Sequence, residues 1–300
     1  LLYQLMVDRF EVFYPNNFLW RTYRIFPYLS FFLIKLTHEF FPPKPLKNYE
    51  SSYGTTSGLY GPSEFGEFWY KFFPHNPIAP ERNVYFDYVD KKEISEDILN
   101  VLNLEMKYIY SVYNYPLLFK NVYNTLRIHG LIKALPRSVF IITWRDPKYL
   151  AASIYNARIK KYGSKDCWLS VEPKEIKEIL SYPVWDQIML QIYYLYNQIL
   201  EYIAAYGGKK FYMVDYQLLA ENPLNTLDKI ALFLKANNIK IKQRNISIEK
   251  FSYRKTEPMD PEEKDMWIES YQKYRAKFER LYITLKERTW KEDLNEYRST

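Results

Sequence analysis

Residues 138–156 read SVFIITWRDPKYLAASIYN, and this segment is the most informative about the fold. Its residues 139–142 are a continuous apolar, β-prone run, which is typical of a strand covered on both faces in a parallel sheet. Asp146 and Pro147 then predict the start of a helix, because Asp can accept hydrogen bonds from free amides and Pro fits the first helical turn. We therefore expect a parallel strand that leads directly into a helix.

Two polar side chains follow the predicted strand. Arg145 stands at its carboxyl end, and Ser153 lies two helical turns further on. Open parallel sheets usually bind ligands at the carboxyl ends of their strands, where a guanidinium and a hydroxyl can meet the same phosphate. An arginine after a strand is also often the partner of a carboxylate, and a serine in a helix is often a surface residue. Taken alone, the two side chains leave both interpretations open.

The spacing of these residues adds a family resemblance. R-(D/N)-P-(K/R)-x4-S after a buried strand, which includes Lys148 here, resembles the 3′-phosphate-binding segment of sulfotransferases that use 3′-phosphoadenosine 5′-phosphosulfate (PAPS). The resemblance implies an α/β fold in which a parallel β-sheet is flanked by helices in three layers, as in P-loop nucleotide kinases. It also implies that Arg145 and Ser153 bind PAPS and its product, adenosine 3′,5′-bisphosphate (PAP).

Three other segments, one before and two after residues 138–156, resemble the same family. Residues 209–234 follow its pattern R-Y-E-x-L-x2-N-P-x3-L-x2-I-x2-F-L in most positions, which supports the fold more than the mechanism. Lys120 closes a short apolar run where the family often has a strand ending in K-(N/S)-P, and so becomes a candidate cofactor ligand. Residues 251–264 resemble a basic loop that closes over the nucleotide; here Arg254 and Lys255 are present but its glycine is missing.

A glutamate is the candidate general base. Many sulfotransferases place a catalytic Glu after the second strand, in a segment rich in Phe and Trp such as K-E-x2-F-F. The corresponding segment is EFGEFWYKFF, where Glu64 and Glu67 are spaced to share one face of a helix. Either residue could instead be a solvated acid that complements the helix dipole, and the choice between them stays open. His75 and His129 are the next candidates for the base.

The first residues also resemble a known part of the family. The chain starts LLYQLMVDRF, and in sulfotransferases a helix of this kind follows a first strand and a loop P-(K/R)-S-G-T-T that cradles the 5′-phosphosulfate. The 300 residues contain no such loop, since the only GTT, at 54–56, does not follow a predicted strand. We therefore expect a fragment that lacks the first strand and phosphate loop, with one sulfotransferase-like domain over 1–288 and a polar tail over 289–300.

Composition limits the classes of function. With 300 residues, 48% of them hydrophobic, the chain can bury one large core. A net charge of +7 suits an anionic cofactor but is too diffuse to predict binding to nucleic acid. The lone Cys167 excludes an intramolecular disulfide, and no His/Cys cluster predicts a metal site. We expect a cytoplasmic protein without a transmembrane segment, in which residues 26–41 form a buried or lipid-facing amphipathic helix.

The predicted activity is transfer of a sulfuryl group from PAPS to a hydroxyl or amine of a small-molecule, glycan or lipid acceptor. A P-loop kinase is one alternative, although it needs acidic Mg²⁺ ligands, for which Asp215 is the only candidate. A non-catalytic binding module of the same fold is the other, because the phosphate loop is missing. In every case we expect residues 138–144 to lie between strands from 117–120 and 210–214, with Arg145 at their carboxyl edge.

Overall fold

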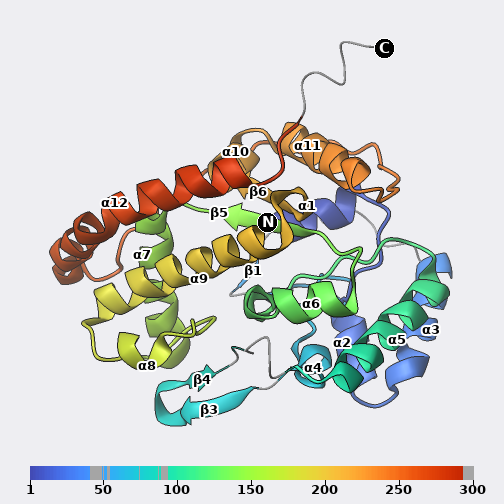
Figure 1. The fold of residues 1–300 in the computed structure, drawn as a ribbon, viewed down its shortest axis with the longest axis horizontal. Coiled ribbons are helices and arrows are strands. Elements are labelled where there is room, and N and C mark those ends of the chain that lie inside the picture. The colour runs from blue at the N-terminus through green and yellow to red at the C-terminus, as the bar shows by residue number, and fades with distance from the viewer. Residues whose placement is uncertain are drawn as a thin grey trace.

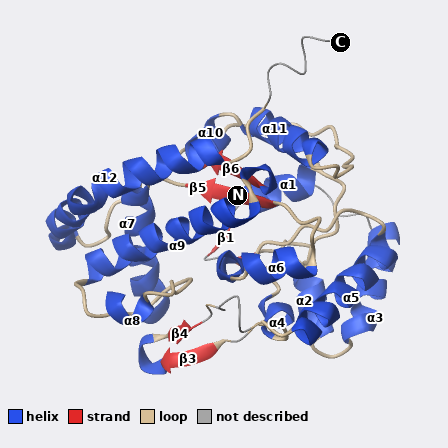
Figure 2. Ribbon diagram, in the orientation of Figure 1, coloured by secondary structure: helices blue, strands red, loops and turns tan. Residues whose placement is uncertain are grey.

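A short parallel sheet lies at the centre of the molecule (Figures 1 and 2). The computed structural model describes residues 1–40, 49, 51–52, 55–73, 75–86, 88 and 94–292. Strand β5 (Phe140–Trp144) pairs in parallel with β6 (Phe211–Asp215), in a register that runs from Phe140 opposite Phe211 to Trp144 opposite Asp215. The expected strand and its expected neighbour near 210–214 are thereby confirmed.

Helices cover both faces of this strand pair. Ile142 and Trp144 of β5 pack into one core, whereas Ile141 packs into another, because successive side chains of a strand point to opposite faces. The first core is built with α7 (Pro147–Tyr162), α9 (Val184–Tyr206) and α12 (Lys264–Arg288), and the second with α1 (Leu2–Arg9), α10 (Tyr216–Glu221) and α11 (Pro223–Ala236). The three-layer arrangement of helices, strands and helices follows from this alternation.

The prediction for the other neighbour of β5 was wrong. Residues 117–120 do not pair with β5 in the described part of the chain; Leu117 instead forms a parallel bridge with Phe13. Phe13 N donates to Pro116 O at 2.9 Å, and Leu118 N donates to Phe13 O at 2.8 Å. Leu118 still packs in the same core as Ile141. The segment is half-buried rather than buried, and packing of its side chains against a core does not determine which strand its backbone pairs with.

A separate aromatic core lies beside the sheet, at the lower right of Figure 1. Its helices are α2 (Asn17–Tyr23), α3 (Pro27–Phe40), α4 (Gly66–Tyr70), α5 (Glu96–Tyr113) and α6 (Ile128–Ala134). Two antiparallel hairpins, the helix α8 and four 3₁₀ turns complete the described elements: β1 (Ser51–Ser52) with β2 (Thr55–Thr56), β3 (Asn76–Ala79) with β4 (Val84–Phe86), α8 (Ile176–Ile179), η1 (Pro80–Arg82), η2 (Val122–Leu126), η3 (Gly208–Lys210) and η4 (Pro261–Glu263). The two threonines of the GTT stretch lie in a hairpin, and its Gly54 lies outside the described residues.

The packed chain continues just past α12. Trp290 N donates to Phe211 O at 2.8 Å, and the Trp290 ring packs on the rings of Tyr212 and Phe233. We expected a polar tail from residue 289 onward. The start of that segment instead lies along the edge of β6 that does not face β5, because the indole supplies apolar surface that the surrounding polar residues lack.

A buried carboxylate fixes the start of α12. Glu263 accepts hydrogen bonds from Trp185 Nε1 at 2.6 Å and from Lys165 Nζ at 2.5 Å. Burial disfavours its charged form, but these hydrogen bonds outweigh burial, so the pKa of Glu263 lies below its ordinary value of 4.5. The negative charge therefore stabilises the junction between α12 and the segments that carry Trp185 and Lys165.

Acid should weaken this junction. Because the pKa of Glu263 is lower in the folded state, its contribution to stability is fully present above the ordinary value of 4.5 and is lost as the pH falls through the folded-state value. We expect the Tm of the parent protein, measured by circular dichroism, to fall more steeply over this acid range than the Tm of Glu263→Gln. Glu262→Gln, which removes an exposed carboxylate, is the control. Identical Tm profiles for the parent and Glu263→Gln would contradict this account.

Candidate functional site

Arg145 lies at the carboxyl end of β5, at the point where α7 begins. Asp146 Oδ1 accepts a hydrogen bond from Lys148 N at 2.9 Å, and Pro147 occupies the first turn of the helix, as the sequence predicts. The guanidinium carbon of Arg145 lies 5.5 Å from the ring centroid of Tyr216, the first residue after β6. The ends of both paired strands therefore contribute to one local surface around the guanidinium.

A strap, defined as residues 254–259, lies against this surface. Arg145 Nη2 donates to Arg254 O at 3.2 Å and to Thr256 Oγ1 at 3.0 Å. The side chains of Arg254 and Lys255 are themselves exposed to solvent. The structure therefore brings the predicted basic loop to the predicted phosphate-binding arginine, although they are more than one hundred residues apart in the chain.

One side chain of α7 holds the other half of the strap. Asn156 Nδ2 donates to Glu257 O at 2.8 Å, and Asn156 Oδ1 accepts from Met259 N at 2.8 Å. Ser153 lies three residues earlier on α7 and is half-buried, so it shares a helix face with Asn156. Asn156 was not singled out from the sequence; its spacing from Ser153 is the signal that could have identified it.

Arg145 also has unused hydrogen-bonding capacity. Its Nε is buried and has no hydrogen-bond partner among the described residues. A buried donor without a partner costs about 1–3 kcal/mol, so an anionic oxygen at this position would be stabilised. The guanidinium, the hydroxyl of Ser153 on α7 and the positive charges of the strap together suit an anion such as a phosphate.

Glu64 and Lys120 form a second centre. Their side chains make an ion pair, and Asn121 Nδ2 donates to Glu64 O at 3.1 Å. Burial, followed by the charges of Tyr14 and Glu64, raises the pKa of Tyr3 well above its ordinary value of 10.0, so the first turn of α1 lies near this pair. A carboxylate and an ammonium therefore meet here, and such a pair can accept a proton and stabilise an anion.

The backbone next to Glu64 has an unusual conformation. Phe65 precedes α4 with φ 52° and ψ 49°, the left-handed region that costs a bulky residue about 1–2 kcal/mol. Its ring is fully buried, stacks on Phe68 at 5.2 Å between centroids, and contacts Tyr23 edge-on at 4.8 Å. Aromatic packing therefore holds Phe65 in its strained backbone conformation and fixes the direction of the neighbouring Glu64 side chain.

Glu67 has different partners. It accepts from Trp20 Nε1 at 2.6 Å and forms an ion pair with Arg24. Burial disfavours its charge, but hydrogen bonds from its own backbone, Arg24 and Trp20 outweigh burial and lower the pKa of Glu67. The expectation that the two glutamates share a helix face was wrong, because α4 begins at Gly66 and Glu64 therefore lies outside the helix. Only Glu64 is paired with a predicted cofactor ligand.

Asp215, the candidate metal ligand of the kinase alternative, has a structural role. Its Oδ1 accepts from Gln217 N at 2.8 Å and from Leu218 N at 3.3 Å at the start of α10, and its Oδ2 accepts from Tyr282 OH at 3.3 Å. Among the described residues, no group of three His, Cys, Asp or Glu side chains is arranged to hold a metal ion. The described helices likewise include none with the length and apolar character to cross a bilayer.

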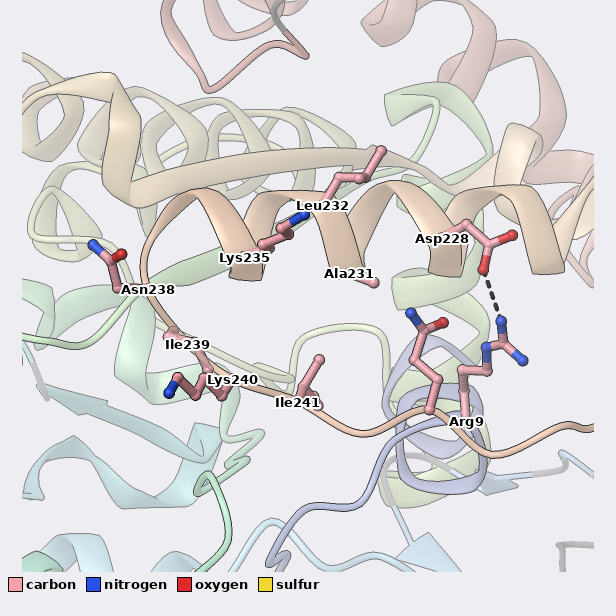
Figure 3. Close-up of a pocket in the computed structure, with 10 residues that line it drawn as sticks. Arg9, Asp228, Ala231, Leu232, Lys235, Asn238, Ile239, Lys240 and Ile241 are labelled. Carbon is pink, nitrogen blue, oxygen red and sulfur yellow. Dashed lines mark hydrogen bonds and ion pairs between the residues drawn. The ribbon is translucent and has the colours of Figure 1, made fainter. Parts of the chain in front are cut away.

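A hollow of about 860 Å³ lies elsewhere on the surface, between α11 and residues 238–243 (Figure 3). Arg9 and Asp228 form an ion pair of 2.9 Å at one end of it. Beside its other end, Asn237 Nδ2 donates to Lys209 O, just ahead of the amino end of β6. None of the candidate site residues lines this hollow, so its size does not make it the functional site.

Comparison with known proteins gives one match. Residues 84–293, more than half of the chain, match the family model described as "Sulfotransferase domain". The matched range contains the Arg145 surface, the strap and Lys120, whereas Glu64 and Glu67 precede it. No curated protein and no solved structure matched the chain.

Removing the side chain of Asn156 should loosen the strap. Asn156→Ala deletes two hydrogen bonds, each contributing about 0.5–1.5 kcal/mol, so local opening should increase roughly tenfold. Trypsin should then cleave after Arg254 or Lys255 roughly tenfold faster, measured by mass spectrometry of the first fragments. Asn197→Ala, whose amide donates to Glu201 one turn further along α9, is the control. An unchanged cleavage rate would show that other contacts hold the strap.

Proposed function

Because the chain belongs to the sulfotransferase domain family, we propose that it transfers a sulfuryl group from PAPS to an acceptor hydroxyl or amine. The family has the P-loop-like α/β fold, and the molecule is accordingly an α/β protein with helices on both sides of paired strands. One observation carries the proposal: Arg145 at the carboxyl end of the parallel strands lies under a strap that holds two further basic residues. The acceptor is a small molecule, a glycan or a lipid.

The Arg145 surface fits the 3′-phosphate of PAPS. The unpartnered Nε of Arg145 and the hydroxyl of Ser153 would bind the phosphate oxygens, as the family pattern implies. Arg254 and Lys255 would add positive charge from the strap, whose backbone is already tied to Arg145 and α7. The missing strap glycine does not prevent this, because the strap reaches Arg145 through a backbone carbonyl and a threonine hydroxyl.

Glu64 and Lys120 fit the two chemical roles that remain. PAPS would supply the sulfuryl group and the leaving phosphate. As the bond from sulfur to the acceptor oxygen or nitrogen forms and the bond from sulfur to the 5′-phosphate oxygen breaks, Glu64 would take the acceptor proton and Lys120 would stabilise the leaving phosphate. Their ion pair supports this assignment, since it places a candidate proton acceptor directly beside a candidate phosphate ligand. Glu67 is engaged by Trp20 and Arg24, and we assign it a structural role.

The role of Arg145 can be tested by binding. Arg145→Ala removes a charge-assisted contact, so isothermal titration calorimetry should show PAP binding weakened by about ten- to a hundredfold. Arg137→Ala, which removes an exposed arginine just ahead of the amino end of the same strand, is the matched control and should bind as the parent does. Equal affinity of Arg145→Ala and the parent would overturn the assignment, and tighter binding of ATP with Mg²⁺ than of PAP would favour the kinase alternative.

The role of Glu64 can be tested by turnover. Glu64→Gln keeps the shape of the side chain but cannot accept the proton, so kcat should fall by about 10²- to 10⁴-fold while PAP affinity stays nearly unchanged. The assay follows transfer of labelled sulfuryl groups from PAPS to model hydroxyl and amine acceptors. Glu67→Gln should retain most of the turnover and serves as the control. Full turnover by Glu64→Gln would show that the base lies elsewhere.

A further inference from the structure

The first two turns of helix α3 are apolar on both of their sides, apart from the buried Ser30. Phe31 and Ile34 point into the aromatic core and are almost fully buried. The opposite side, with the turn ahead of it, forms what we call the apolar tip: Ile25 (68% exposed), Phe26 (54%), Tyr28 (59%), Leu29 (50%) and Phe32 (49%). A helical stretch that is apolar on all sides is normally buried on all sides, so this exposed side indicates a surface that binds something beyond the described residues.

The neighbouring helix extends the apolar tip. Tyr108 of α5 donates its hydroxyl proton to Tyr28 O at 3.1 Å, and the two rings lie 5.6 Å apart between centroids. Leu104 and Val101 lie one and two turns before Tyr108 on α5 and are also exposed, by 63% and 49%. The exposed apolar surface therefore spans two helices, which distinguishes it from the single apolar residues that most protein surfaces expose.

The charged residues of 17–37 are all basic, whereas on α5 the exposed Asp97 lies one turn before Val101. Residues 17–37 contain three basic residues, Arg21, Arg24 and Lys35, and no Asp or Glu. Arg24 is neutralised by its ion pair with Glu67, but Arg21 is exposed, and Lys107 is exposed on α5 one residue from Tyr108. Exposed aromatic and aliphatic side chains next to basic residues match the chemistry of an anionic bilayer surface, with its phosphates outside and its acyl chains beneath.

We propose that the apolar tip inserts into the headgroup region of an anionic phospholipid bilayer, with Arg21 and Lys107 facing the lipid phosphates. A second copy of the chain fits this surface less well, because a two-fold pair would bring the same basic residues of both copies together. In Figure 1, β5 points away from the end of the molecule that carries α3. A bilayer bound at α3 therefore leaves the carboxyl ends of β5 and β6 accessible. The proposal does not depend on the assigned enzymatic activity.

Vesicle flotation tests the proposal. The 300-residue protein should bind vesicles of phosphatidylcholine mixed with phosphatidylserine at least about tenfold better than vesicles of phosphatidylcholine alone, and added salt should weaken that binding. Phe26→Ser with Leu29→Ser removes two exposed apolar groups and should lower binding to the mixed vesicles at least about tenfold. The matched control is Met266→Ser with Ile283→Ser, which removes two similarly exposed residues of α12 and should bind as the parent does.

Three results would overturn the proposal. The first is equal binding of the parent to both kinds of vesicle, and the second is loss of binding by the α12 control to the same extent as by the tip variant. The third is absence of vesicle binding together with a parent dimer that the tip variant converts to a monomer in analytical ultracentrifugation, which would assign the surface to a second copy. Matching circular dichroism spectra of all variants would show that the tip variant is folded.

Discussion

The register of β5 against β6 sets the position of the Arg145 surface and of the cores on both faces of the strands. Because Trp144 lies opposite Asp215, the residues that follow, Arg145 and Tyr216, emerge side by side and their side chains are in contact. A shift of one residue would move Arg145 by about 3.3 Å along the sheet and would exchange the two faces of the strand. Such a shift would place Ile142 and Trp144 in the wrong core. The burial of apolar side chains on both faces of β5 therefore fixes the position of Arg145 at the end of the strand.

The two polar centres of the molecule are held in different ways. The strap reaches Arg145 and α7 through four hydrogen bonds made by only two side chains, Arg145 and Asn156. The position of Glu64 depends instead on buried aromatic rings around Phe65. Breaking polar contacts at the surface costs little, whereas disturbing packed rings costs several kcal/mol. One centre is therefore easily opened, and the other is rigid.

The sequence predicted the local features of the fold well and the longer-range ones only in part. The strand before Arg145 and the helix start at Asp146 depend on neighbouring residues, and the structure has both. The partner of residues 117–120 was predicted wrongly, because an apolar segment can reach a shared core without pairing its backbone. Glu64 and Glu67 were not separable by spacing alone, since the start of α4 at Gly66 depends on the packing of the Phe65 ring.

The left-handed backbone at Phe65 has a consequence for how this protein can evolve. Glycine at this position would relieve the backbone conformation but would remove a ring that fills the core, and any other residue with a large side chain would keep the same backbone cost. No single substitution improves both the backbone conformation and the packing of the core. A viable change at residue 65 therefore needs a second substitution among the aromatic residues around it. The residue next to Glu64 is thus expected to vary only together with its aromatic neighbours, which makes paired variation in related sequences a record of this packing.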